Sequence, residues 1–132
     1  MMNQSTELNI QGHGLFPTPV VQADLPYATR INEDLRAVIE ARMVSHPSTA
    51  HSNLGGWQSS WDLADWGGAA AHEVLEHAKT VAGRMTCDRQ GKAVQVDWQL
   101  NAWANVNGPG HGNEFHTHPG SFWSGTYYVD DG

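Results

Sequence analysis

Residues 69–102 read AAAHEVLEHAKTVAGRMTCDRQGKAVQVDWQLNA, and within them the spacing of the apolar residues changes from helical to strand-like. In the first part, apolar residues return every three or four positions, which is typical of a helix with one buried face. These residues are Val74, Leu75, Ala78, Val81, Ala82 and Met85. From Val94 to Ala102, apolar and polar residues alternate, as they do in a half-buried strand. The stretch therefore predicts a helix over about 69–86 and a strand over about 94–102.

A further helix is predicted on the N-terminal side, over about 28–45. Its apolar residues at helical spacing are Ile31, Leu35, Val38 and Ile39. We expect it to begin after Pro26 and to end at His46, because a residue that precedes a proline disfavours the helical conformation. Upstream, residues 15–21 contain two prolines that cannot donate to a sheet, so we expect an edge strand there at best.

On the C-terminal side, a turn and an apolar run predict further strands. Residues 107–110 read Asn-Gly-Pro-Gly, which is a strong turn sequence. Residues 121–129 are mainly apolar and aromatic and predict a well-buried strand. We expect one long antiparallel pairing around the loop at 105–115. Two helices followed by strands indicate an α+β fold, with the helices packed on a sheet.

The composition fits a single domain and argues against charged partners. The chain has 132 residues, 39% of them hydrophobic and 16% charged, so it has enough apolar residues for a core. We expect residues 1–13 to be a flexible lead-in and residues 14–132 to be the domain. The net charge is −7, and the seven Lys and Arg residues are scattered. Binding to nucleic acid or to an anionic membrane surface is therefore not expected, since both need clustered basic residues.

The expected location is cytoplasmic. The first residues lack the basic and apolar stretches of a signal peptide, and no apolar run approaches the roughly 20 residues that cross a bilayer. Cys87 is the single cysteine, so an intrachain disulfide is not possible. The oligomeric state is not readable from the sequence.

A pair of histidines, His116 and His118, is the candidate metal site. Alternate residues of an extended chain project to the same side, so the two imidazoles point together while Thr117 points away. Imidazole suits Fe, Zn, Cu and Ni, and a third ligand from elsewhere would complete a facial set with open positions. His111, on the preceding loop, is a candidate third ligand or supporting group. The alternative is that the pair is simply polar sequence at a loop edge.

For the histidines of the 69–86 helix and for the tryptophans, we predict structural roles. His72 and His77 lie near the edges of the apolar stripe of the 69–86 helix, and we expect them to be solvated or capping residues rather than ligands. The six tryptophans are expected in core and sheet packing. We expect the stretch from Trp57 to Trp66 to pack beside the mouth of the metal site.

Several motifs together resemble a bacterial family of 2-oxoglutarate- and Fe(II)-dependent oxygenases. The resemblance runs from Leu15 to the end of the chain. The segments that carry it are LFPTP (15–19), SNLGGWQS (52–59), NAWANV (101–106), HTHPG (116–120) and WSGTYYV (123–129). It implies a double-stranded β-helix, or jelly roll, preceded by the helices, with the H-x-H motif on the metal-binding strand. It also implies oxidation of C–H bonds by O₂ with Fe(II) and 2-oxoglutarate as co-substrate.

The chain departs from the oxygenase pattern in two ways. The commoner motif is H-x-D/E with a distant His, whereas here His118 stands at the acid position. Either His118 replaces the acid, or His116 and His118 do not both bind the metal. Glu114 is another nearby acid, but it lies two residues before His116 and not two residues after it, so as a ligand it would reverse the order of the motif. The distal His and the basic residue for 2-oxoglutarate are absent, so we interpret the chain as an N-terminal fragment of a longer protein, with an incomplete β-helix and inactive alone.

The remaining assignments are less specific. Asn101, Asn105, Asn113 and Tyr127 are candidates for contact with the co-substrate, or for ordering the loop. The substrate is a small molecule or a peptide, and the sequence does not choose between them. One alternative is a cupin-like metal protein, since Gly110 and the H-x-H motif match the start of a cupin motif, although its following glutamate is missing. Another is a fragment or interaction module without catalysis.

Overall fold

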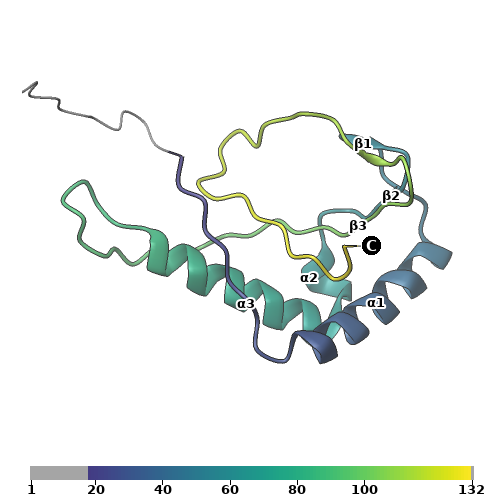
Figure 1. The fold of residues 1–132 in the computed structure, drawn as a ribbon, viewed down its shortest axis with the longest axis horizontal. Helices are drawn as coiled ribbons and strands as arrows, with labels where there is room; N and C mark the ends of the chain where they lie inside the picture. The colour runs from purple at the N-terminus through teal and green to yellow at the C-terminus, as the bar shows by residue number, and fades with distance from the viewer. Residues whose placement is uncertain (1–17, 132) are drawn as a thin grey trace, which may run out of the picture.

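The computed structural model describes residues 18–131. Two long helices, α1 (Ala28–Ser45) and α3 (Gly68–Met85), flank a short helix, α2 (Leu63–Trp66). Four two-residue strands form two small sheets: β1 (Asn53–Leu54), β2 (Trp57–Gln58), β3 (Asn105–Val106) and β4 (Gly112–Asn113). The sheets lie together at one end of the molecule, and after β4 the chain makes a wide arc before it returns over the helices (Figure 1).

Helix α1 confirms the prediction for residues 28–45. Ile31, Leu35 and Ile39, which are four residues apart and share one face, are its buried residues. The helix ends where His46 becomes extended ahead of Pro47, and the His46 N–H donates to the Arg42 carbonyl at 2.9 Å.

Helix α3 confirms the prediction for residues 69–86, and it packs against α1. Its fully buried residues are Ala70 and Ala71 near its start. The rest of its apolar stripe is only partly covered, and Met85 is 47% exposed at its end. The buried residues of α3 are therefore the small side chains at its start.

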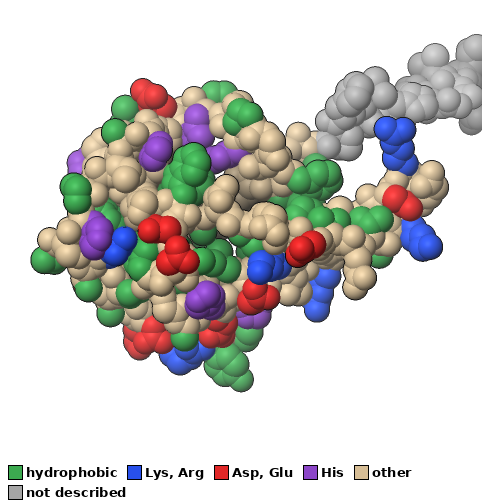
Figure 2. Space-filling view, turned by 180° about the vertical axis from the view of Figure 1, so that it is seen from behind, with side chains coloured by type: hydrophobic (Ala, Val, Ile, Leu, Met, Phe, Trp, Pro, Cys, Tyr) green, Lys and Arg blue, Asp and Glu red, His purple; other side chains and the backbone are tan. Residues whose placement is uncertain are grey.

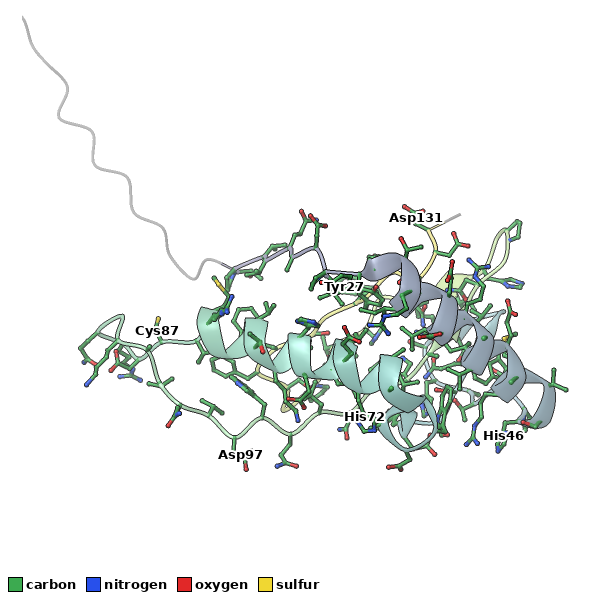
Figure 3. The ribbon with its side chains drawn as sticks, turned by 90° about the horizontal axis from the view of Figure 1, so that it is seen from below. Tyr27, His46, His72, Cys87, Asp97 and Asp131 are labelled. Atoms are coloured by element: carbon green, nitrogen blue, oxygen red, sulfur yellow. The ribbon has the colours of Figure 1, made fainter. Side chains whose placement is uncertain are left out.

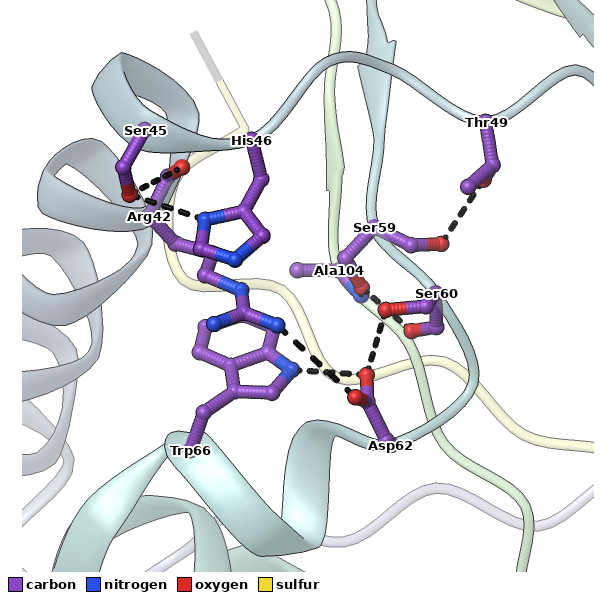
Figure 4. A network of polar contacts seen from close by, with 9 residues as sticks. All are labelled: Arg42, Ser45, His46, Thr49, Ser59, Ser60, Asp62, Trp66 and Ala104. Atoms are coloured by element: carbon purple, nitrogen blue, oxygen red, sulfur yellow. Dashed lines mark hydrogen bonds and ion pairs between the residues drawn. The ribbon is translucent and has the colours of Figure 1, made fainter.

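Helix α2 is absent from the sequence-based expectation, and side-chain bonds to Asp62 hold it (Figure 4). The Asp62 carboxylate accepts from the Ser60 hydroxyl at 2.5 Å and from the Trp66 indole N–H at 2.9 Å. Arg42 of α1 lies 3.7 Å from the same carboxylate and stacks over the Trp66 ring. The bonds from Ser60, and then those from Trp66 and the charge of Arg42, lower the pKa of Asp62, although partial burial opposes them. Asp62 thus joins α1, α2 and the segment before α2.

The sheet pairings differ from the expected hairpin around 105–115. β3 pairs with β2 and β4 pairs with β1, both antiparallel, so the two strands that flank the turn do not pair with each other. Both partners lie within residues 53–58, where the sequence pattern predicts no strand. The prediction of one long pairing is wrong, because this upstream segment provides strands that compete for the same edges.

The strand predicted over 94–102 is also wrong. Among residues 18–131, the segment from Val94 to Asn101 forms no ladder with another strand, and only Ala102 makes an isolated bridge, to Asp62. Val94 and Trp98 are half-buried and their neighbours are exposed. The segment runs alongside α3, as the position of Asp97 shows (Figure 3). Val96 and Leu100, which belong to the same alternating set, are 44% and 40% exposed, so the alternation marks neither a continuously covered face nor a strand in a sheet.

The run at 121–129 is extended but is not the predicted buried strand, because no partner strand lies beside it within residues 18–131. Trp123 and Tyr127 face the helices: the Trp123 indole N–H donates to the Thr86 hydroxyl at 2.9 Å, and the Tyr127 hydroxyl donates to Asn32 at 2.6 Å. Phe122 and Tyr128 are 73% and 71% exposed. Side-chain bonds to α1 and to the residue directly after α3 thus hold this segment instead of a ladder.

The core lies where α1, the start of α3 and the sheet β2–β3 meet. It consists of Ile31, Leu35, Ile39, Trp57, Ala70, Ala71 and Ala104. The described residues thus form a mixed arrangement of helices and small antiparallel sheets, which agrees with the helical part of the predicted α+β class. They show no closed barrel, so the expected jelly roll is not confirmed. In the expected edge strand at 15–21, residues 18–21 form no strand. Residues 15–17 and the expected lead-in at 1–13 lie outside the described range.

Within residues 18–131, no helix combines the length and the apolar character that crossing a membrane requires.

Candidate metal site

Two turns of the same kind bracket the segment that carries His116 and His118. In each turn a proline is followed by a glycine with positive φ, and the fourth residue donates its N–H to the carbonyl of the first, as a type II turn requires. His111 donates to Gly108 at 3.0 Å, and Ser121 donates to His118 at 3.1 Å. Between them, Glu114 donates to the Ser52 carbonyl at 2.7 Å and extends the contact between β4 and β1. The pair is therefore tethered on both sides, although the sheet ends before it.

The rings of His116 and His118 meet as predicted from their spacing. Their Nε2 atoms are 3.1 Å apart, and the ring planes are inclined at 68°. His116 is exposed and His118 is half-buried. Without a metal, a separation of 3.1 Å also allows one ring N–H to donate to the other ring.

The tautomer of His116 follows from its second ring nitrogen. Nδ1 lies 2.7 Å from the Glu114 carbonyl oxygen. A carbonyl only accepts, so Nδ1 is the donor, and in the neutral ring Nε2 is then the nitrogen that has the lone pair. A backbone carbonyl on the far nitrogen is the usual support of a metal-binding histidine.

The distance between the two Nε2 atoms suits a single metal ion. Imidazole nitrogens bind first-row metals at about 2.0–2.1 Å, and two such ligands at right angles on one ion are about 3 Å apart. The observed 3.1 Å is close to this value. The residues present therefore fit two neighbouring positions on an ion such as Fe(II).

A third protein ligand does not join the pair in the described part of the chain, where no group of three His, Cys, Asp or Glu side chains is arranged to hold a metal. His111 is engaged elsewhere: its Nδ1 accepts the Gly108 N–H at 3.1 Å. Its ring also lies against Gly55, where an added Cβ would be 2.5 Å from the ring. His111 thus closes its own turn onto the loop between β1 and β2.

A row of aromatic rings leads away from the pair. His118 stacks on Trp103 at 5.8 Å between ring centroids, with the planes inclined at 30°. Trp103 is next to Trp61 at 5.8 Å, and Trp61 is next to His51 at 5.1 Å. Trp61 is thus the member of the Trp57–Trp66 stretch that approaches the site. Trp103 and His51 were not singled out by sequence, because nothing in their local pattern distinguishes them from core residues.

The four residues predicted to contact a co-substrate are spread over the fold. Asn101 is exposed on the extended segment before β3, and Asn105 is exposed on β3. Asn113 of β4 donates its amide to the Ser52 hydroxyl at 3.1 Å. Tyr127 is bonded to Asn32 of α1, and burial, followed by the charge of Glu73, raises its pKa. Asn113 and Tyr127 therefore have structural partners.

His72 and His77 lie on α3, away from the pair in sequence and in element. The space-filling view shows several histidine side chains at the surface of the broad end that holds the small sheets (Figure 2). A hollow of about 350 Å³ beside α3 is lined by His72, Glu76, Lys79 and residues of the 97–100 segment. It contains neither His116 nor His118.

Comparison with known proteins gives one match. The sequence model of a family described as "Putative 2OG-Fe(II) oxygenase" matches residues 101–132, which is roughly a quarter of the chain and includes both histidines. No curated protein and no solved structure matches the chain. The match is a hint of oxygenase function and nothing more specific.

Proposed function

We propose that His116 and His118 bind Fe(II) and that the chain forms part of a 2-oxoglutarate-dependent oxygenase site. The observation that carries this proposal is the pair of Nε2 atoms 3.1 Å apart, with the far nitrogen of His116 on a backbone carbonyl. This geometry supports metal binding. The family match over residues 101–132 supports iron and 2-oxoglutarate over the other metals that imidazole accepts.

The role of the chain in this proposal is to hold and orient ligands. Bound iron with 2-oxoglutarate supplies the O₂-dependent oxidation of a C–H bond. The Glu114 carbonyl accepts from Nδ1 of His116, so that Nε2 would be the nitrogen of the neutral ring that binds the metal. The Pro119-Gly120 turn fixes the chain directly after His118. Two imidazoles leave the remaining coordination positions to a further ligand, to the co-substrate and to O₂.

A titration of the metal-free chain with Fe(II) under argon, followed by addition of 2-oxoglutarate, tests this function. We expect Fe(II) binding, and then a weak visible charge-transfer band when 2-oxoglutarate chelates the iron. We also expect the band to be absent in His116→Ala, while the matched control His72→Ala keeps it.

The outcomes separate the candidate functions. Binding of Fe(II) with no spectral response to 2-oxoglutarate would contradict the oxygenase proposal and favour a metal protein of another class, such as a cupin. Equal Fe(II) binding by wild type and His116→Ala would contradict the site itself.

A further inference from the structure

His118 differs from His116 in what orients its ring. The far nitrogen of His116 is bonded to the Glu114 carbonyl. For His118, the side-chain hydrogen-bond and ring contacts found among residues 18–131 are those with the ring of His116 and with the ring of Trp103. The plane of the His118 ring therefore depends on its stacking with Trp103, since the contact with His116 is made through the nitrogen that would face a metal.

Trp103 itself is held by backbone bonds on both sides. The Ser59 N–H donates to the Ala104 carbonyl at 3.0 Å, and the Ala104 N–H donates to the Ser59 hydroxyl at 3.0 Å. On the other side, the Leu63 N–H donates to the Ala102 carbonyl at 3.1 Å. These bonds tie residues 102–104 to residues 59–63, the segment that contains Trp61.

The same pairing places Trp61 behind Trp103. Trp61 lies midway between the two bonded residues of its segment, as Trp103 lies between Ala102 and Ala104. The ring centroids of Trp61 and Trp103 are 5.8 Å apart, and the ring centroid of His51 is 5.1 Å from that of Trp61. Ala104 is buried in the core, so the segment that carries Trp103 is anchored there.

We infer that Trp103, backed by Trp61, is a positioning residue that sets the orientation of the His118 imidazole for metal binding. This inference rests on the proposed metal-binding role of His116 and His118. An aromatic face restrains the tilt of the ring and leaves both of its nitrogens free. It thereby supplies for His118 the support that a carbonyl supplies for His116.

The test measures Ni²⁺ affinity by calorimetry for wild type, Trp103→Leu and Trp103→Phe. Ni²⁺ is a suitable probe because it accepts imidazole ligands. Loss of an outer support costs about 10- to 100-fold in metal affinity, so we expect Trp103→Leu to bind at least about tenfold more weakly. Trp103→Phe keeps an aromatic face and should recover most of the affinity. The control is Trp98→Leu, a half-buried tryptophan outside the row, which should bind as wild type does.

Ring-proton shifts of His118 in the metal-free chain provide a readout that does not depend on the metal. A ring stacked on an indole has protons shifted upfield, and we expect this shift in wild type and in Trp98→Leu but not in Trp103→Leu. An unshifted His118 in wild type would overturn the inference and leave the proposed function standing.

Folding of the variants is checked by circular dichroism. If Trp103→Leu does not fold, Trp61→Leu replaces it, because Trp61 is 54% exposed and its loss removes less buried surface. The inference then predicts weaker Ni²⁺ binding by Trp61→Leu. Wild-type affinity in a folded Trp103→Leu or Trp61→Leu chain would overturn the inference alone, whereas no Ni²⁺ binding by wild type would overturn the proposed function and the inference together.

Discussion

The imidazole rings of His116 and His118 are supported by different contacts. His116 is exposed and depends on one backbone carbonyl, whereas His118 is half-buried against an aromatic ring. The first position resembles a usual metal-binding histidine with a carbonyl behind it. The second stands where the commoner oxygenase motif has an acid.

Replacing His118 by alanine tests whether both rings bind the ion. If His118 is a ligand, His118→Ala should lose Fe(II) about as completely as His116→Ala, because one imidazole alone is a weak site. Equilibrium dialysis of Fe(II) under argon measures the loss. Retention of most of the iron by His118→Ala would show that His116 binds without it.

Gly120 lies in the turn that follows His118, and its backbone has a conformation that other residues rarely adopt. Its φ is +82°, and the space around a Cβ there is open, so the strain of Gly120→Ala is purely conformational. We expect this variant to lower the free energy of unfolding by about 1 kcal/mol. Gly125→Ala, also in open space but without a positive φ, is the matched control and should change it little. Denaturant unfolding would contradict this account if the two variants were equally stable.

At the scale of elements, Asp62 links α1 to α2 and to the segment that carries Trp61. Its pKa is below the usual value of 3.8, chiefly because Ser60 donates to the carboxylate. A lowered pKa in the folded state means that the ionised form contributes stability above the usual pKa. That contribution is lost as the pH falls through the folded-state pKa.

The variant Asp62→Asn should therefore be less stable than wild type at neutral pH, and the difference should shrink as the pH falls below 4. Thermal unfolding between about pH 7 and pH 3 measures it. The control is Asp88→Asn, a carboxylate in the turn after α3 that lies outside the α1–α2 network. A difference between wild type and Asp62→Asn that stays constant over this range would contradict the role given to the charge.

At the scale of the whole molecule, the two long helices are predictable from sequence and the sheets are not. A helix closes its hydrogen bonds within itself, so the spacing of Ile31, Leu35 and Ile39 is sufficient evidence. A strand needs a partner elsewhere in the chain. The segment with alternating residues at 94–102 lies beside α3 without a partner strand, and its Val96 and Leu100 are exposed.

In the candidate site, too, local features are predictable from the sequence, and features that depend on distant segments are not. The approach of His116 to His118 follows from their spacing of two residues. The row through Trp103 and Trp61 depends on the bonding of residues 102–104 to residues 59–63, which no local pattern reveals. The expectation that the Trp57–Trp66 stretch packs beside the site does not identify Trp61 as the residue that lies next to Trp103.

Hydrogen exchange tests this division between helices and unpaired segments. Amides of Val94–Asn101 and of residues 121–129, apart from Ser121, have no ladder partner within the described range, so we expect them to exchange much faster than the amides around Leu35 in α1. The measurement is exchange at neutral pH followed by mass spectrometry. Protection of both segments comparable to that of α1 would contradict the description of these segments as having no ladder partner.

The most direct test of the central claim is to count the imidazole ligands of the bound iron by X-ray absorption spectroscopy of the Fe(II)-loaded chain. Two imidazoles on one ion are predicted for wild type, and one for His118→Ala at an iron concentration that loads the variant. A wild-type spectrum with one imidazole or none would contradict the claim that His116 and His118 hold the same metal ion.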